Sequence, residues 1–338
     1  MAFSNRVLTT TQDKLVPMVV DTILNSNVLA SRMLSRAKKW SGETMKFPIK
    51  YQKNSTGGSF SGFDTFSTAA SDTRVRLSFD PKFQHITVSL PLDELSVNAT
   101  EEKVLDLMGL EMQSSAQDMA DDIGTAFYAD GTGNSSKDFL GLGAIVDDGT
   151  SVATYGSLSR TTYSTLNATV TASGGTLTLA KMATLFNAIT SGSQKPTIGM
   201  CTEAVWALIE QLVQPQERII KDVGMKKDLV LNTGATGLVY KGFPIIADEK
   251  CTTQTLFFLN ENFIDFYALP MAETQPAKFK AQDIEGNDYS TVMGLGFSWS
   301  GWVKPTNAAA VVGQVYLGGE LIGTNPKRSG KLTGITTV

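Results

Sequence analysis

The chain has 338 residues, which is long for one compact core, so two lobes or an embellished single domain are expected. Hydrophobic residues make up 42% of the sequence and charged residues 18%, and 30 glycines indicate many turns. The net charge of −4 argues against a dedicated nucleic-acid binder, whose surface should be strongly basic.

The first 40 residues are basic although the whole chain is acidic. They hold six basic and two acidic side chains, so the remainder of the chain carries a net charge of −8. A basic arm of this kind can meet an acidic surface or nucleic acid, and a solvated helix face is at least as good an interpretation.

The cysteines and the apolar runs exclude several other classes. Cys201 and Cys251 are too far apart for a metal knuckle and too few for a disulfide framework, which fits a reducing compartment. The N-terminus lacks the pattern of a secretory signal, and no apolar run is long enough to cross a membrane.

The first third of the chain changes from helical to strand periodicity. Residues 11–37 predict two short amphipathic helices, broken near 25–27. Apolar residues then alternate over 45–51 and again over 75–90, with a change of phase at 80–81 that a bulge or turn explains. Residues 43–90 therefore predict a long two-stranded hairpin with a glycine-rich tip. Such a ribbon is marginal alone, so we expect it to lie against a neighbouring subunit.

The strongest single element is a helix from about 99 to 129. Its apolar residues recur at spacings of three and four: Val104, Met108, Met112, Ala116, Met119, Ile123 and Phe127. At 1.5 Å per residue the helix spans roughly 45 Å, more than most globular helices, so we expect a strut.

The remainder predicts a mixed lobe followed by strands. Over roughly 150–265, polar irregular sequence gives way to helices at 176–192 and 203–214, which flank a short buried strand. Further strands follow at 237–269, and the tail from Thr291 is again typical of strands. The fold class is therefore α+β.

The glycine-rich stretch at 128–143 fails two tests for a ligand site. A phosphate loop needs G-x-x-x-x-G-K-[ST] between a strand and a helix, and Gly131, Gly133 and Lys137 have the wrong spacing. A calcium loop counted from Asp130 lacks the glycine at its sixth position and the glutamate at its twelfth. We expect Gly131 and Gly133 to form a turn or hinge at the end of the long helix.

Other candidate sites also have simpler interpretations. His85 is the only histidine and lies in a strand pattern, so a surface or interface position is favoured over catalysis. Asp118 and Asp122 form an i, i+4 pair that can serve acid–base or metal chemistry, but an acidic face or a patch for a basic partner is favoured. Three phenylalanines at the hairpin tip lack interleaved basic residues, so they indicate a protein contact rather than base stacking.

The order of these elements resembles the major capsid proteins of tailed bacteriophages, whose fold is shared with encapsulin shells and the floor domain of herpesvirus capsids. The resemblance covers nearly the whole chain. It rests on the N-terminal arm, the hairpin at 43–90, the long helix at 99–129 with the following ADGTGNSSKDFLGLGAIVDD, and the late run GFSWSGWVKPTNAAAVV.

The resemblance implies a division of the chain into five parts. These are an N-terminal arm at 1–42, an extended β-hairpin loop at 43–92, a spine helix with the first part of a peripheral domain at 93–149, an axial domain at 150–265, and the second part of the peripheral domain with a C-terminal tail at 266–338.

The function implied by the resemblance is structural. The subunit would self-assemble into pentamers and hexamers of an icosahedral shell around packaged double-stranded DNA, with no catalytic role, cofactor or metal. Its partners would be other copies, a portal, a scaffolding protein, a candidate decoration protein and DNA held by weak non-specific contacts, with no membrane involved. Its location would be the virion capsid, assembled in the host cytoplasm.

The expected intersubunit contacts are charged and aromatic residues of the arm, the hairpin and the long helix: Arg32, Arg36, Lys50, Lys53, Phe60, Phe63, Asp64, Phe66, Asp118 and Asp122. Some family members cross-link a loop lysine to a neighbour's asparagine with a catalytic glutamate. Lys50 or Lys53 and Asn307 suit the first two roles, but no glutamate matches the third, so this activity is not carried over.

Three alternatives remain open from the sequence. An encapsulin-like shell that holds cargo enzymes shares the fold, and neighbouring portal and terminase genes would separate it from a phage capsid. A hydrolase using Asp118 with Asp122 would lose turnover on Asp118→Ala and stay monomeric. A β-rich tail or adhesin protein would form trimers or fibres.

Overall fold

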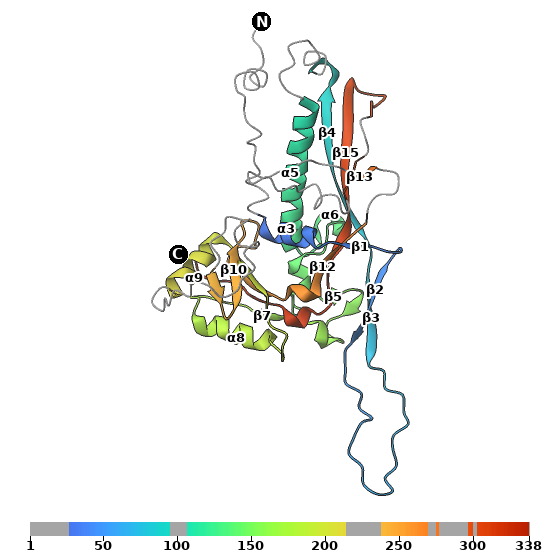
Figure 1. Ribbon diagram of the computed structural model, residues 1–338, viewed down its shortest axis with the longest axis vertical. Coiled ribbons are helices and arrows are strands. Elements are labelled where there is room, and N and C mark those ends of the chain that lie inside the picture. Colours follow the sequence, from blue (N-terminus) through green and yellow to red (C-terminus); the bar gives the residue numbers. More distant parts are fainter. Residues whose placement is uncertain are drawn as a thin grey trace.

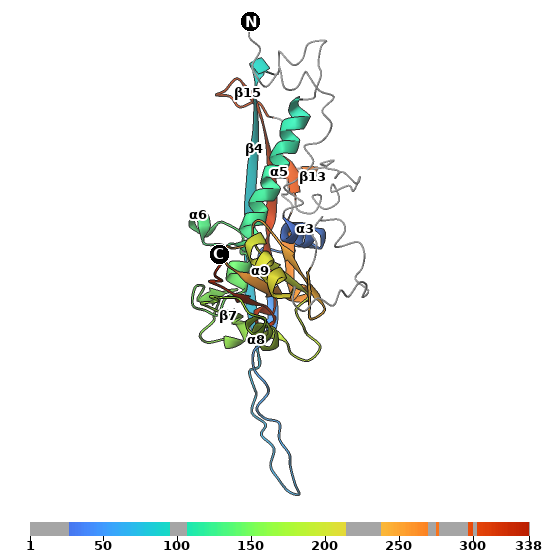
Figure 2. The ribbon, with the colours of Figure 1, turned by 90° about the vertical axis from the view of Figure 1, so that its left-hand side faces the viewer.

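The computed structural model describes residues 27–94, 107–213, 238–269, 275–276, 297–299 and 303–337. Two six-stranded sheets form the body of this part of the chain. The long helix α5 (Leu107–Tyr128) stands beside the first sheet, and a hairpin projects well beyond the body at the other end (Figures 1 and 2). The predicted α+β class is confirmed.

The first sheet is built around one long strand. Strand β15 is fourteen residues long and pairs with β12 and β14 along one part of its length and with β4 over ten positions. The order is β1-β12-β15-β14-β13, with β4 also on β15. The strands are β1 (Lys38–Lys39), β4 (Lys82–Pro91), β12 (Ile264–Ala268), β13 (Gln275–Pro276), β14 (Phe297–Trp299) and β15 (Ala310–Gly323).

The second sheet is covered by helices on one face and by the main core on the other. Its order is β7-β16-β11-β8-β10-β9. Because both faces are buried, its central strands are apolar without alternation, as IGMC and LFFL illustrate. The strands are β7 (Thr169–Thr171), β8 (Ile198–Cys201), β9 (Leu238–Tyr240), β10 (Phe243–Ala247), β11 (Leu256–Leu259) and β16 (Gly330–Leu332).

Helices α8 (Leu179–Ile189) and α9 (Glu203–Val213) pack on this second sheet through a separate apolar cluster. Helix α8 starts where the Thr178 side chain accepts a hydrogen bond from the Lys181 N–H, which satisfies one free amide of the first turn. Its buried face is formed by Met182, Leu185, Phe186 and Ile189. Both helices lie where the sequence predicts them.

The remaining elements are short. They are α3 (Val28–Ser35), α6 (Gly133–Ser136), α7 (Leu142–Ile145), β2 (Met45–Lys50), β3 (Arg74–Phe79), β5 (Thr154–Tyr155), β6 (Leu158–Ser159) and the 3-10 turns η1 (Ser164–Leu166), η3 (Glu261–Phe263) and η4 (Pro326–Arg328). Helix α3 packs against α5 and β12, which binds the N-terminal end of the described chain to the body.

The hairpin is shorter than the sequence predicts. Strands β2 and β3 pair from Met45↔Phe79 to Lys50↔Arg74, as expected. The prediction was wrong for residues 82–90, because β4 leaves the hairpin at the change of phase and joins β15. The long apolar partner strand, more than 200 residues later in the chain, offers ten paired positions that a two-stranded ribbon lacks.

Helix α5 confirms the predicted apolar stripe where its side chains are described. Met119, Ile123 and Phe127 are buried in the main core, and the helix ends at Tyr128, close to the expected end. The predicted start near residue 99 and the expected helix within 11–26 lie outside the described residues.

The end of the chain returns to the second sheet. Strand β16 pairs antiparallel with β11 and parallel with β7. The resemblance implied that residues 266–338 belong to the peripheral domain and a C-terminal tail. The pairing of β16 with β11 and β7 was therefore not predicted.

Candidate intersubunit surfaces

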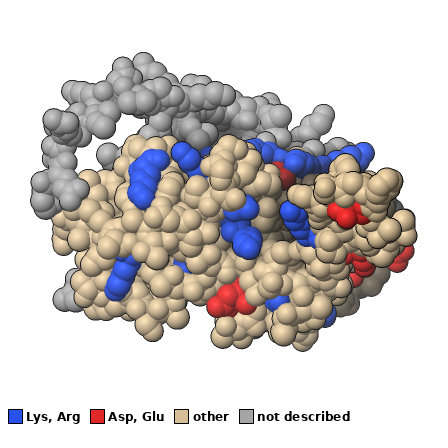
Figure 3. Space-filling view, turned by 90° about the horizontal axis from the view of Figure 1, so that it is seen from below, with Lys and Arg blue, Asp and Glu red and all other residues tan. Residues whose placement is uncertain are grey.

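The hairpin ribbon has one apolar and one basic face. Met45, Phe47 and Ile49 alternate with exposed residues along β2 and pack against the main core, where the Phe47 ring lies 5.4 Å from that of Tyr267. The opposite face exposes four cations: Lys46, Lys50, Arg74 and Arg76. Basic side chains also gather on the face seen from the hairpin end (Figure 3).

Two of these cations lie directly across the ribbon from one another. Lys50 is paired in register with Arg74, an arrangement that is unfavourable in an isolated hairpin. No ion pair involves either side chain in the described part of the chain. Lys53 is also exposed, beyond the paired strands.

The hairpin tip presents aromatic rings to solvent. Phe63 is fully exposed, Phe60 is 67% exposed and Phe66 is 66% exposed. The rings of Phe60 and Phe66 meet edge to face at 5.1 Å, and Asp64 closes a turn by accepting the Ser61 N–H at 2.8 Å. Exposed aromatic residues at this density mark a contact surface, so the predicted role stands as a prediction.

Arg32 does not lie on a free surface. Its guanidinium forms a two-point ion pair with Glu261, with N···O distances of 2.8 and 2.6 Å, and only 16% of its side chain is exposed. Thr197 also donates to Glu261, at 3.2 Å. Arg32 therefore stabilises the subunit's own fold, and its expected role as a subunit contact stays a prediction.

Arg36 is partly committed in the same region. It donates to the backbone carbonyls of Glu261 and Ile264 at 3.3 and 3.4 Å, while 40% of its side chain stays exposed. Its role in a subunit contact stays a prediction.

The acidic pair lies on the exposed side of α5. Asp118 and Asp122 are both exposed, and between them Asp121 forms an ion pair with Lys250 at 2.8 Å. Partial burial raises the pKa of Asp122, and the charges of Asp121 and Asp118 raise it further. Among the described residues no cluster of His, Cys, Asp and Glu could hold a metal. The role of Asp118 and Asp122 as a patch for a neighbour stays a prediction.

The turn after α5 is shaped by positive backbone angles. Gly131 has φ +78°, a backbone conformation that residues with a side chain rarely adopt. Gly133 does not have a positive φ, but a Cβ there would come within 2.1 Å of the Asp138 carboxylate. Asn134 and Ser135 also have positive φ values. The turn is confirmed, and movement about it stays a prediction.

Three buried acidic groups that accept hydrogen bonds from distant segments were not anticipated. Asp248 accepts from the Leu29 N–H and the Tyr128 hydroxyl, Glu261 binds Arg32, and Glu320 accepts from the Leu140 N–H. Glu320 had a signal in the sequence, as the single charge in the apolar run of 308–323. The other two lie at strand ends, where nothing in the sequence marks the partner.

The remaining candidates lie in unremarkable places. His85 is exposed on β4, opposite Tyr316 of β15. Cys201 and Cys251 are free and buried. Among the described residues no helix has the length and apolarity to cross a membrane.

Comparison with known proteins shows the fold. No model of a known family and no curated protein matches the chain. Solved structures match it from end to end, and they are phage capsids and an encapsulin, so the chain has the fold shared by these shell-forming subunits. The resemblance seen in the sequence is confirmed at this level.

Three of these structures illustrate the likeness. A chain in the capsid of cyanophage A-1(L) matches with a TM-score of 0.73 and 16% identity, covering 99% of this chain and 100% of that chain. The encapsulin of Synechococcus elongatus matches with a TM-score of 0.61, 10% identity and coverages of 100% and 98%. The capsid of the myovirus phage XM1 matches with a TM-score of 0.53, 12% identity and coverages of 99% and 99%.

Proposed function

We propose that the chain is the major capsid protein of a tailed phage, which self-assembles into pentamers and hexamers of an icosahedral shell. The observation that carries this proposal is the match to the cyanophage capsid chain, which extends over 99% of this chain and 100% of that one. A shared fold alone does not assign a function, so the surface chemistry of this chain must support it.

The exposed hairpin provides that support. It presents aromatic rings at its tip and exposed cations along one face, both of which a solitary subunit leaves in water. Repetition of one such contact in each of many copies stabilises a shell even where each contact is weak. The acidic pair on α5, Asp118 with Asp122, is a second surface of this kind.

The finer assignments belong to the same proposal. Residues 1–42 act as the arm and 43–81 as the extended loop. Residues 150–265 together with β16 act as the axial domain, and the other parts, including β4, act as the peripheral domain. The subunit has no catalytic role, meets a portal, a scaffolding protein and a decoration protein, and encloses DNA by weak contacts. Gly131 and Gly133 serve as a hinge between the spine helix and the axial domain during shell expansion.

An encapsulin-like compartment is the second candidate, because the encapsulin match covers 100% of this chain. The two differ in content and in gene context. A phage capsid is encoded beside portal and terminase genes and encloses double-stranded DNA, whereas an encapsulin encloses a cargo protein.

Expression of the chain, alone and with any scaffolding protein encoded beside its gene, followed by negative-stain microscopy, tests the proposal. Closed polyhedral shells, tubes or capsomers are expected. A matched variant in which residues 53–72 are replaced by a short turn should stay folded, because β2 and β3 still pair, but should not close shells. A monomer that persists at high concentration under both conditions would refute the proposal.

A further inference from the structure

The turn between α5 and α7 is held to the first sheet by an acid and a base. Glu320 of β15 accepts a hydrogen bond from the Leu140 N–H, and the Nζ atom of Lys82 on β4 donates one to the Ser136 carbonyl oxygen. The two side chains come from neighbouring strands, because Lys82 is paired in register with Gly319, the residue before Glu320. A carboxyl and an ammonium group therefore hold the same turn at two places four residues apart.

The segment that Lys82 holds has an unfavourable backbone conformation. Asn134, Ser135 and Ser136 of the short α6 have φ values of 48°, 60° and 64°. This is the left-handed region, which residues other than glycine visit as single residues and rarely as a run. A run of three persists only where the surrounding contacts hold it. The hydrogen bond from Lys82 is one of those contacts, so its loss should let the run relax.

Lys82 and Glu320 influence each other without forming an ion pair. Among the described residues no ion pair involves either side chain. Burial raises the pKa of Glu320 to about 8, and the charge of Lys82 opposes that shift. At neutral pH and below, the carboxyl is therefore mostly uncharged and does not draw the ammonium group away from Ser136.

The other titratable groups around Glu320 offer no second cation. Tyr155 of β5 is close enough for the charge of Glu320 to raise its pKa, and its hydroxyl donates to the Gly323 carbonyl. Tyr267 of β12 stands opposite Glu320 in register. Lys137 and Asp138 lie on the turn itself, but among the described residues Lys82 is the charged side chain that shifts the pKa of Glu320.

We propose that Lys82 and Glu320 form a proton-operated switch for the turn after α5. While Glu320 keeps its proton, Lys82 holds the Ser136 carbonyl. When Glu320 gives its proton to water, the buried carboxylate needs a partner, because an unpaired buried charge is strongly destabilising. The Lys82 ammonium group then leaves Ser136 for Glu320, and the left-handed run relaxes.

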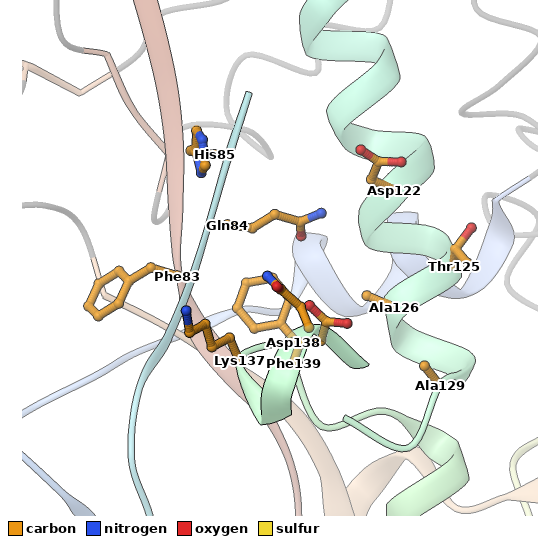
Figure 4. A pocket seen from close by; sticks show the side chains of 11 residues that line it. Phe83, Gln84, His85, Asp122, Thr125, Ala126, Ala129, Lys137, Asp138 and Phe139 are labelled. Atoms are coloured by element: carbon orange, nitrogen blue, oxygen red, sulfur yellow. The ribbon is translucent and has the colours of Figure 1, made fainter. Parts of the chain in front are cut away.

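The switch acts on one wall of a pocket. Lys137, Asp138 and Phe139 line a pocket of ≈ 380 Å³ together with residues of β4 and α5 (Figure 4). These three residues directly follow Ser136, so relaxation of the run should change the shape of this pocket. The inference concerns the single subunit and goes beyond the proposed function.

Spin labelling of unassembled subunits tests the switch. Ser135→Cys places a nitroxide on the exposed part of the turn, while Cys201 and Cys251 are buried and stay unlabelled. With a pKa of about 8, about 1% of Glu320 is ionised at pH 6 and about 90% at pH 9. The mobile fraction of the electron paramagnetic resonance spectrum should therefore rise at least tenfold between these two pH values.

Three variants and one control label assign the change. In the labelled chain, Glu320→Gln should keep the immobile spectrum at both pH values, and Lys82→Met should give the mobile spectrum at both. Lys82→Arg keeps the cation and should preserve the response to pH. A label at Asn187→Cys, exposed on α8, should show no change.

A label at position 135 that is equally mobile at pH 6 and pH 9 would overturn the inference, and so would a response to pH that persists in Glu320→Gln. The first comparison alters neither Lys82 nor Glu320, so it decides the matter even where a variant fails to fold. Shell formation plays no part in these measurements, so their outcome is separate from that of the proposed function.

Discussion

Glu320 should make the subunit less stable as the pH rises through neutrality. This carboxyl on β15 is 1% exposed, and burial raises its pKa from 4.5 to about 8, although the Leu140 N–H and the charge of Lys82 oppose the shift. Because the pKa in the folded state lies above that of the unfolded chain, Glu320 contributes full stability below about pH 4.5. That contribution is lost as the pH rises to about 8.

The size of the effect follows from the two pKa values. One pKa unit corresponds to about 1.4 kcal/mol. Between pH 6 and pH 8, Glu320 is ionised in the unfolded chain, whereas in the folded chain it ionises only near pH 8. The free energy of unfolding should therefore fall by about 2 kcal/mol over this interval. Glu320→Gln keeps an acceptor for the Leu140 N–H but has no charge, so it should abolish this share of the pH dependence.

Urea unfolding of unassembled subunits at pH 6 and pH 8, followed by tryptophan fluorescence, measures this difference. Glu210→Gln, at an exposed position of α9, is the matched control and should keep the wild-type pH dependence. Equal changes in stability for the wild type and Glu320→Gln would show that Glu320 is ionised in the folded protein already at pH 6, and the reasoning from burial would be wrong.

The other predictions concern the ion pair, the core and the turn. Glu261→Ala leaves the Arg32 guanidinium without its 2.6 Å partner and should cost about 3–5 kcal/mol in urea unfolding, with Glu203→Ala, an exposed residue, as a near-neutral comparison. Phe127→Ala removes a fully buried ring from the main core and should cost about 3–5 kcal/mol, measured as a lower thermal midpoint. Gly131→Ala places a Cβ at φ +78° and should cost about 1–2 kcal/mol; an unchanged denaturation midpoint would mean that the turn rearranges freely.

Local periodicity was enough to predict most individual elements. The alternation along β2 and β3, the stripe of α5 and the two helices of the second sheet all follow from apolar spacing, because each element must bury one face. The break at Asp80-Pro81 was also visible. Pairing was not predictable: the alternation of β4 suits a continuation of the β2–β3 hairpin as well as a ladder with β15, and only the fold decides between them.

The contact surfaces were predictable in part. Aromatic residues in a glycine-rich segment were a sufficient signal for the exposed tip. The sequence does not show that the Arg32 side chain is more buried than that of Arg36, because its partner Glu261 lies more than 220 residues away. The pocket between β4, α5 and the turn that follows α5 was not predictable from the sequence, because these three segments meet only in three dimensions.

The distribution of buried charge explains which parts of the subunit are free to respond to a neighbour. Asp248 and Glu261 hold α3 to the body, and Glu320 holds the turn after α5 to β15. Each is a contact between segments distant in sequence, so breaking it leaves a buried polar group without a partner and costs more than breaking an exposed contact would. Beyond β2 and β3 the hairpin has no such anchor among the described residues, and its tip keeps its aromatic rings in water. The body is therefore held together by contacts that the hairpin tip lacks, and the tip is freer to adapt to the subunit that it meets.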